Sequence, residues 1–193
     1  MNNDLKCLNK TLEDHLLWLS SNGSKGKQAD FRNQNLSGTN LYNISLAYAN
    51  LANANLTNAN LTNANLQNAN LENASLAYAN LIGANLIGAN LTYTNLYYAN
   101  LANANLANAI LYNASLANAN LAYANLANAN LYNAYLTSTN LENANLENVK
   151  GVQVFKCFYV ENNEKKFNYF FNSTKAKKEM SKRLANRQCS WVE

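Results

Sequence analysis

An apolar residue stands at every fifth position of this chain from Phe31 to Leu146, with no break in phase. These 24 positions hold one phenylalanine and 23 leucines. The residue two places earlier is alanine in 19 of the 24 repeats, and the residue one place earlier is asparagine in 18. The repeating unit is therefore Ala-Asn-Leu-x-Asn, as in residues 59–63, and an unbroken repeat of this kind predicts a solenoid.

A period of five fits neither regular element. On an α-helix, five residues rotate the side chain by about 500°, so the leucines would spiral around the helix without forming a stripe. On a flat strand, an odd step would place successive leucines on opposite faces. The period fits a chain that turns a corner once per repeat, with leucine inward, the small alanine beside it and asparagine outward. Asparagine suits such corners because it tolerates turn conformations.

Composition excludes several classes of protein. Proline is absent, which excludes collagen-like and proline-rich chains. With 48% hydrophobic residues and a net charge of only +4, the chain has enough apolar surface to fold, so disorder is not expected. No apolar run reaches the 18 or so residues of a membrane span. The N-terminus shows no signal-peptide pattern and the three cysteines are widely spaced, so we expect a cytoplasmic protein with reduced thiols.

Residues 29–148 resemble the pentapeptide-repeat family, whose unit reads Ala-Asp/Asn-Leu-x-x. The resemblance implies an all-β solenoid, a right-handed quadrilateral β-helix with four repeats per coil. The 24 repeats would then make 24/4 = 6 coils, and a strand spacing of about 4.8 Å would give a rod roughly 29 Å long. The passage His15-x-x-Trp18-Leu19, followed by Gly23 and Gly26, is similar to the N-terminal cap segment of cyanobacterial members.

The chain divides into three expected parts: residues 1–28, 29–149 and 150–193. In the first, leucines at helical spacing predict an amphipathic capping α-helix over residues 4–20, followed by a loop; they are Leu5, Leu8, Leu12, Leu16 and Leu19. In the third, residues 152–160 and 167–171 flank a polar turn and predict a β-hairpin. Ser173 is expected to cap a helix running to about Gln188, which completes a basic C-terminal ββα element.

No residues predict catalysis. The only histidine, His15, lies on the expected capping helix, and no nucleophile–base pair or paired carboxylates can be placed together from the sequence. Cys7, Cys157 and Cys189 do not show metal-ligand spacing. We therefore expect a protein that is not an enzyme, with no catalytic, cofactor-binding or metal-binding residues, and a structural role for His15.

Tyrosines give one candidate for a binding site, because ten of the 12 tyrosines lie in the repeat region at positions outside the core. With four repeats per coil, Tyr112 and Tyr132, and likewise Tyr78 and Tyr98, would stack one coil above the other. Clustered tyrosines are typical of protein-binding surfaces; the alternative is ladder packing that only stiffens the surface. The candidate partner-binding residues are Tyr78, Tyr93, Tyr97, Tyr98, Ile110, Tyr112, Tyr132 and Tyr135.

The C-terminal part gives a second candidate, because residues 150–193 carry ten basic and four acidic side chains. Basic residues near aromatic ones can contact nucleic acid through its phosphates. The alternative is the solvated face of a cap over the last coil. The candidate nucleic-acid contacts are Lys165, Lys166, Lys175, Lys178, Lys182, Arg183 and Arg187.

Some members of the family are rod-shaped acidic mimics of DNA that bind a type II topoisomerase. Duplex DNA carries one negative charge per about 1.7 Å, or roughly 17 over such a rod. Residues 30–149 carry one basic and four acidic side chains, a net charge of −3, which disfavours mimicry. The sequence thus favours a rigid protein–protein interaction scaffold with an unidentified protein partner, and the alternative is a nucleic-acid-associated regulator. The sequence leaves the oligomeric state open.

Overall fold

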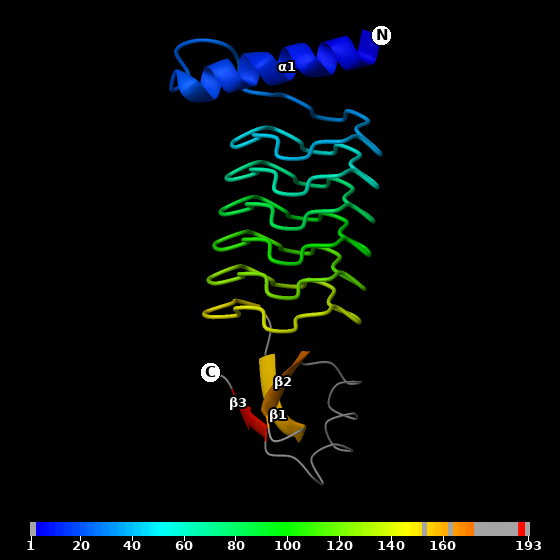
Figure 1. Cartoon of the computed structure of the whole chain (residues 1–193), viewed down its shortest axis with the longest axis vertical. Helices are drawn as coiled ribbons and strands as arrows, with labels where there is room; N and C mark the ends of the chain where they lie inside the picture. The colour runs from blue at the N-terminus through cyan, green and yellow to red at the C-terminus, as the bar shows by residue number, and fades with distance from the viewer. Residues whose placement is uncertain (1–2, 152–153, 162–163, 172–188, 192–193) are drawn as a thin grey trace.

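The computed structural model describes residues 3–151, 154–161, 164–171 and 189–191, with side chains for residues 7–151. The chain begins with helix α1 (Asn3–Ser20), continues as a stack of coils, and then forms strands β1 (Val154–Glu161), β2 (Glu164–Phe171) and β3 (Cys189–Trp191). Figure 1 shows α1 lying across one end of the stack and the three strands following the other end. The stacked coils, residues 29–151, are called the rod below.

Each coil of the rod takes 20 residues. Parallel bridges join residues 20 apart, from Asp30 with Asn50 to Asn130 with Lys150. Main-chain hydrogen bonds follow the same register: the Leu56 N–H donates to the Ser75 carbonyl at 2.7 Å, and the Asn55 N–H donates to the Gln34 carbonyl at 2.9 Å. Four repeats of five residues therefore close one circuit, which gives the rod four sides.

A tight turn forms each corner between neighbouring sides. In a typical repeat the Ala54 N–H donates to the Leu51 carbonyl at 3.0 Å, and the third residue of the turn has a positive φ, as a type II turn requires. That third residue has a positive φ in all 24 repeats: 15 are asparagine, five tyrosine, three glycine and one serine. The 15 asparagines at this position thus follow from the corners, since asparagine and glycine enter this region most readily.

The axis of the rod is filled as the period predicts. Phe31 and 21 of the 23 leucines are buried, and Leu136 and Leu146 near the end of the repeats are half-buried. The alanines two places before them are buried as well, apart from the half-buried Ala134. Thr94 replaces one of these alanines, and its hydroxyl donates to the Leu71 carbonyl at 2.8 Å, which satisfies a buried polar group.

Asparagines on the outside of the rod form ladders from coil to coil. The Asn120 Nδ2 donates to Asn100 Oδ1 at 3.1 Å, and the Asn140 Nδ2 donates to Asn120 Oδ1 at 3.0 Å. The same Asn120 Oδ1 accepts the Ala122 N–H at 3.2 Å. An aspartate keeps the acceptor oxygens but has no N–H to donate to the neighbouring coil. The ladder therefore favours the neutral amide over the carboxylate.

We expect Asn120→Asp to lower the free energy of unfolding by about 0.5–1.5 kcal/mol at neutral pH, the usual effect of losing one hydrogen bond. Asn95→Asp is the matched control. Its Oδ1 accepts the Tyr97 N–H at 3.1 Å, but serines at positions 75 and 115 lie above and below it in the column. Urea unfolding of both variants measures the difference. Equal losses would show that the ladder amide does not contribute.

Helix α1 has the predicted bounds to within one residue, but its buried face differs from the predicted stripe. Leu8 and Leu12 pack against the core of the rod, and His15 is wholly buried. Leu16 was predicted to lie on this face, but it is 49% exposed, so that prediction was wrong. The buried face runs along residues 8, 12, 15 and 19. A step of four residues from 12 to 16 rotates the side chain beyond the edge of this face, so Leu16 points to solvent.

The C-terminal strands form the predicted hairpin. Strands β1 and β2 pair antiparallel, with Val154 opposite Phe171 and Glu161 opposite Glu164. Strand β3 pairs with the other edge of β1, giving the order β2-β1-β3, and the sequence did not predict this third strand. The helix predicted from Ser173 to about Gln188 lies outside the described residues.

Candidate functional site

All eight predicted partner-binding residues are exposed, from 36% for Tyr97 to 66% for Tyr135. Six of them are tyrosines at corners of the rod. Tyr97, Tyr112 and Tyr132 are the second residue of their turns, whereas Tyr78, Tyr93 and Tyr98 are the third. The other two, Ile110 and Tyr135, occupy the bridge position on a side of the rod. The corners project the six tyrosines away from the axis of the rod.

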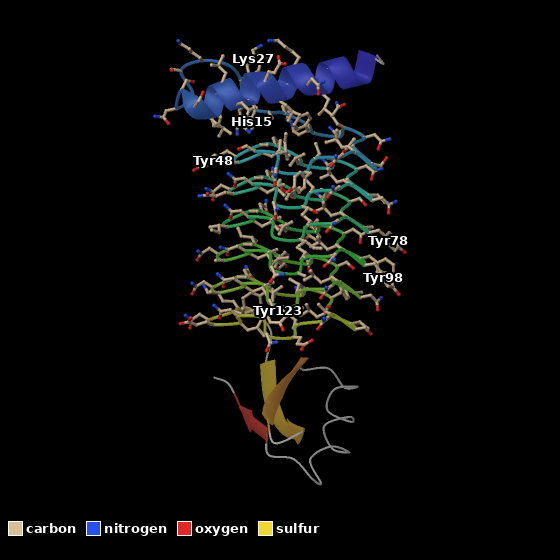
Figure 2. All side chains as sticks on the ribbon, in the orientation of Figure 1. His15, Lys27, Tyr48, Tyr78, Tyr98 and Tyr123 are labelled. Carbon is tan, nitrogen blue, oxygen red and sulfur yellow. The ribbon has the colours of Figure 1, made fainter. Side chains whose placement is uncertain are left out.

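Three tyrosines meet on one edge of the rod, and we call Tyr78, Tyr97 and Tyr98 the tyrosine cluster. The rings of Tyr78 and Tyr98 stack with centroids 5.5 Å apart and planes 8° apart, which confirms the predicted stack. Tyr97 lies edge-on to both, 5.8 Å from Tyr78 and 4.5 Å from Tyr98. Figure 2 shows Tyr78 and Tyr98 one coil apart, pointing outward from the same edge.

The packing inside the cluster raises the pKa of its central tyrosine. Desolvation by the surrounding groups raises the pKa of Tyr97 above its ordinary value, and the neighbouring Tyr98 and Tyr78 raise it further. Like any tyrosine hydroxyl, that of Tyr97 is protonated at neutral pH and can donate a hydrogen bond. The cluster offers a partner exposed aromatic area and polar tips, a combination typical of protein-binding surfaces.

A second pair lies at the adjoining corner. The rings of Tyr93 and Tyr112 are 6.0 Å apart and nearly perpendicular, at 88°, and the Tyr93 N–H donates to the Tyr112 carbonyl at 2.9 Å. Tyr112 and Tyr132 occupy equivalent corners one coil apart, where the Asn113 N–H donates to the Tyr132 carbonyl. Among the side chains that the structure describes, however, these two rings are not in contact, so the predicted stack is wrong: Tyr112 turns towards Tyr93.

Five tyrosines adopt a backbone conformation that their side chain disfavours. Tyr48, Tyr78, Tyr93, Tyr98 and Tyr123 have φ between 54° and 65°, where most other repeats carry asparagine or glycine. For residues other than glycine, asparagine and aspartate this region costs roughly 1–2 kcal/mol. The corner forms with asparagine just as well, so these tyrosines are not there for the fold of the turn. Each of these five tyrosines stands two residues after a core leucine, and this position in the repeat is the sequence signal for a tyrosine with a positive φ.

Exposed tyrosines also occur away from the predicted set. Tyr42, Tyr48 and Tyr123 are 53%, 46% and 59% exposed. Tyr48 packs edge-on against Trp18 of α1, with centroids 6.3 Å apart, whereas Tyr42 and Tyr123 make no ring contact within the described part of the chain. Exposure alone therefore does not distinguish the candidate site. What distinguishes it is that its tyrosines lie against one another.

Charged groups on the rod are few and separate. Asp30 forms an ion pair with Arg32 at 2.6 Å, and this guanidinium lowers the pKa of Asp30 below its ordinary value. The 20-residue register places Glu72, Glu142 and Glu147 at three different corners. The acidic side chains therefore form no continuous line along the rod, in agreement with the argument from composition against DNA mimicry.

The described residues hold no group of three or more His, Cys, Asp or Glu side chains able to bind a metal ion. Cys7 is exposed, and His15 is buried under α1. Of the seven basic residues predicted to contact nucleic acid, Lys165 and Lys166 lie in β2, opposite Val160 and Tyr159 of β1. The other five, Lys175, Lys178, Lys182, Arg183 and Arg187, lie outside the described residues. Within the described part, no helix has the length and apolar character needed to span a membrane.

The repeat region decides the family. The family model of pentapeptide repeats, with eight copies, matches residues 27–63, 54–92, 84–121 and 114–150. Together these matches extend over residues 27–150, well over half of the chain. The chain belongs to the pentapeptide repeat family. The fold of pentapeptide repeat proteins is a right-handed quadrilateral β-helix. This confirms the predicted β-helix as the fold class of the repeat region.

Several solved pentapeptide repeat proteins are similar to this one. HetL of the cyanobacterium Nostoc sp. strain PCC 7120, described as involved in heterocyst differentiation regulation, is 32% identical over 64% of this chain and 68% of its own, with a TM-score of 0.40. Rfr23 of the cyanobacterium Cyanothece 51142 is 30% identical over 63% and 87%, with a TM-score of 0.33. A protein of the Arabidopsis thaliana thylakoid lumen is 29% identical over 52% and 67%, with a TM-score of 0.28. No curated protein matches the chain.

Proposed function

We propose that this pentapeptide repeat protein is a non-enzymatic, rigid scaffold that binds a protein partner through its tyrosines. The rod consists of about six coils, closed by α1 at one end and by the basic C-terminal element at the other. The observation that carries the proposal is the tyrosine cluster, in which the rings of Tyr78, Tyr97 and Tyr98 lie against one another and still remain exposed. Exposed aromatic rings held together in this way are typical of protein-binding surfaces.

The rod suits a scaffold because main-chain hydrogen bonds and a continuous core hold its shape rigid. Every coil bonds to the next through the same register, and the leucine axis is continuous from Phe31 onwards. A partner therefore meets tyrosines whose spacing is fixed by the coils, so little conformational entropy is lost on binding. We place the protein in the cytoplasm. The Arabidopsis relative comes from the thylakoid lumen, so the repeat itself does not determine the compartment.

The triple variant Tyr78→Asn, Tyr97→Ala, Tyr98→Asn tests the proposal, because asparagine and alanine are the residues that other repeats carry at these positions. Relief of strain at two corners offsets the lost ring contacts, which contribute about 0.5–1.5 kcal/mol each. We expect an unchanged far-UV spectrum, stability within about 2 kcal/mol of the parent, and at least tenfold weaker capture of the partner from native lysate.

The control for this experiment is the double variant Tyr42→Ala, Tyr123→Asn. It removes two exposed tyrosines that lie at a different corner of the rod and make no ring contact with other described residues. We expect it to capture the same proteins as the parent. If the triple variant captures as well as the parent while both variants remain folded, the cluster only stiffens the surface. The nucleic-acid alternative stays a prediction, because it depends on side chains beyond those described.

A further inference from the structure

Helix α1 joins the rod through a small set of buried contacts. It lies across the first coil, with Leu8 and Leu12 against the core and His15 wholly buried between helix and coil (Figure 2). The rings of His15 and Trp18 stack with centroids 5.8 Å apart and planes 13° apart. Trp18 in turn contacts Tyr48. We call His15, Trp18, Ala29 and Tyr48 the cap joint.

His15 takes part in the cap joint as a neutral ring. Its Nδ1 accepts the main-chain N–H of Ala29 at 3.1 Å, and Ala29 is the first core residue of the rod. This bond needs the lone pair of Nδ1, so the proton of the neutral ring is on Nε2. Nε2 is buried without a hydrogen-bond partner of good geometry among the described residues. A proton added to Nδ1 would therefore face the Ala29 N–H, donor against donor.

The charged and titratable groups around the joint do not compensate a charge on His15. On α1, Asp14 bonds to Lys10 at 3.0 Å on the exposed side. In the loop, Lys25 and Lys27 are exposed cations. On the first coil, Asp30 is paired with Arg32. Tyr48 contributes only a phenol, and the face of Trp18 attracts a cation without replacing the lost acceptor bond.

We propose that the cap joint is an acid-sensitive clasp: protonation of His15 breaks its bond with Ala29 and releases α1 from the first coil. Release uncovers the end of the rod, whose main-chain groups have no preceding coil to pair with. An uncovered edge of this kind is available for pairing with another chain. The cap joint thus couples the accessibility of this end to pH, and this goes beyond the scaffold role.

The direction of the pH dependence follows from the closed and released states. Burial lowers the pKa of His15 below its ordinary 6.5, and the nearby main chain of Ala47 raises it by less. In the released helix the imidazole regains a pKa near 6.5. Above that pH both states are neutral and the clasp is unaffected. As pH falls below it, the released state gains protons first, and the ratio of released to closed protein rises by up to tenfold per pH unit until the lowered pKa is reached.

The test uses the full chain carrying Trp191→Phe, which leaves Trp18 as its single tryptophan, and follows two signals from pH 8 to pH 5. These are Trp18 emission and hydrogen exchange of the Ala29 amide, with the Asn80 amide of the central rod as internal control. We expect the Ala29 amide to lose at least tenfold of its protection below pH 6.5 while the Asn80 amide keeps its own. The Trp18 emission should change over the same range.

The variant His15→Gln separates titration from packing, because glutamine offers an acceptor oxygen and does not titrate. We expect its Ala29 exchange to be free of the pH transition. Since His15 is the only histidine, NMR of its imidazole gives the pKa directly, even if the variant releases α1 at every pH. A pKa of 6.5 or above in the parent overturns the proposal. So does protection of Ala29 that persists to pH 5, or the same transition in a closed His15→Gln protein.

Discussion

Replacing Leu81 by alanine is expected to lower the free energy of unfolding by about 2–5 kcal/mol, the usual range for a buried leucine. Leu81 has no exposed surface, and its main chain is bonded to the next coil through the Asn100 carbonyl at 2.7 Å. Coils on both sides hold the backbone in place, so the site cannot collapse around the missing methyl groups. Chemical denaturation followed by circular dichroism measures the loss.

Leu136→Ala is the matched control for Leu81→Ala, because it changes the same position of the repeat where the leucine is only half-buried. We expect it to cost less than half as much. The reverse change, Ala79→Leu, should also destabilise by about 1–3 kcal/mol, since Ala79 is 1% exposed and leaves no room for a larger side chain. Unchanged midpoints for both Leu81→Ala and Ala79→Leu would contradict the inward placement of these residues.

Replacing Gly26 by alanine is expected to detach α1. Gly26 has a φ of +70°, and a Cβ there would overlap the Asp14 carbonyl oxygen and lie 2.8 Å from the Trp18 nitrogen. Both atoms belong to the helix backbone, so α1 would have to move as a whole. Most of the stability of a helix in a protein comes from its tertiary packing, and α1 would lose that packing. We therefore expect the helical far-UV signal to fall and the emission of Trp18 to shift.

Gly38→Ala separates backbone strain from this overlap. Gly38 has a similar φ of +64°, but a Cβ there would meet nothing within 4 Å. We expect a loss of about 1–2 kcal/mol from strain alone, and a further 1–3 kcal/mol or so for Gly26→Ala because of the overlap. Thermal unfolding with detection at 222 nm compares the two. Similar losses, with α1 retained in both, would mean that the helix adapts to the added methyl group.

Most of the rod can be predicted from the sequence, because the same five-residue pattern of core and corner residues recurs in every repeat. The inward leucine, the small alanine and the corner all follow from the period, and the burial of residues such as Leu81 agrees with it. The buried face of α1 was harder to predict. Hydrophobicity predicts that Leu16 is buried and His15 exposed, whereas the structure shows the reverse. Burial of His15 depends on a bond to Ala29, 14 residues away, which no helical pattern contains.

The exposed positions of the candidate residues were easier to predict than their contacts. The 20-residue register brings Tyr78 and Tyr98 to the same edge, and they do stack. The same reasoning places Tyr112 over Tyr132, but the ring of Tyr112 packs against Tyr93. Register fixes the position of the main chain, whereas the rotamer depends on whichever neighbour offers an aromatic edge. Strand β3 was missed because a pairing of three residues leaves no periodic signal.

The 20-residue circuit has a consequence for how such a chain can change its length during evolution. Loss or gain of 20 residues keeps every downstream side chain on its own side of the rod and only moves it along the axis. Loss or gain of a single five-residue unit keeps the core intact but rotates everything downstream by a quarter turn. Deletion of one unit between Tyr98 and Tyr112 would carry the later tyrosines to a different edge. A slippage event in a repetitive gene can thus rearrange the surface of this rod without a single substitution.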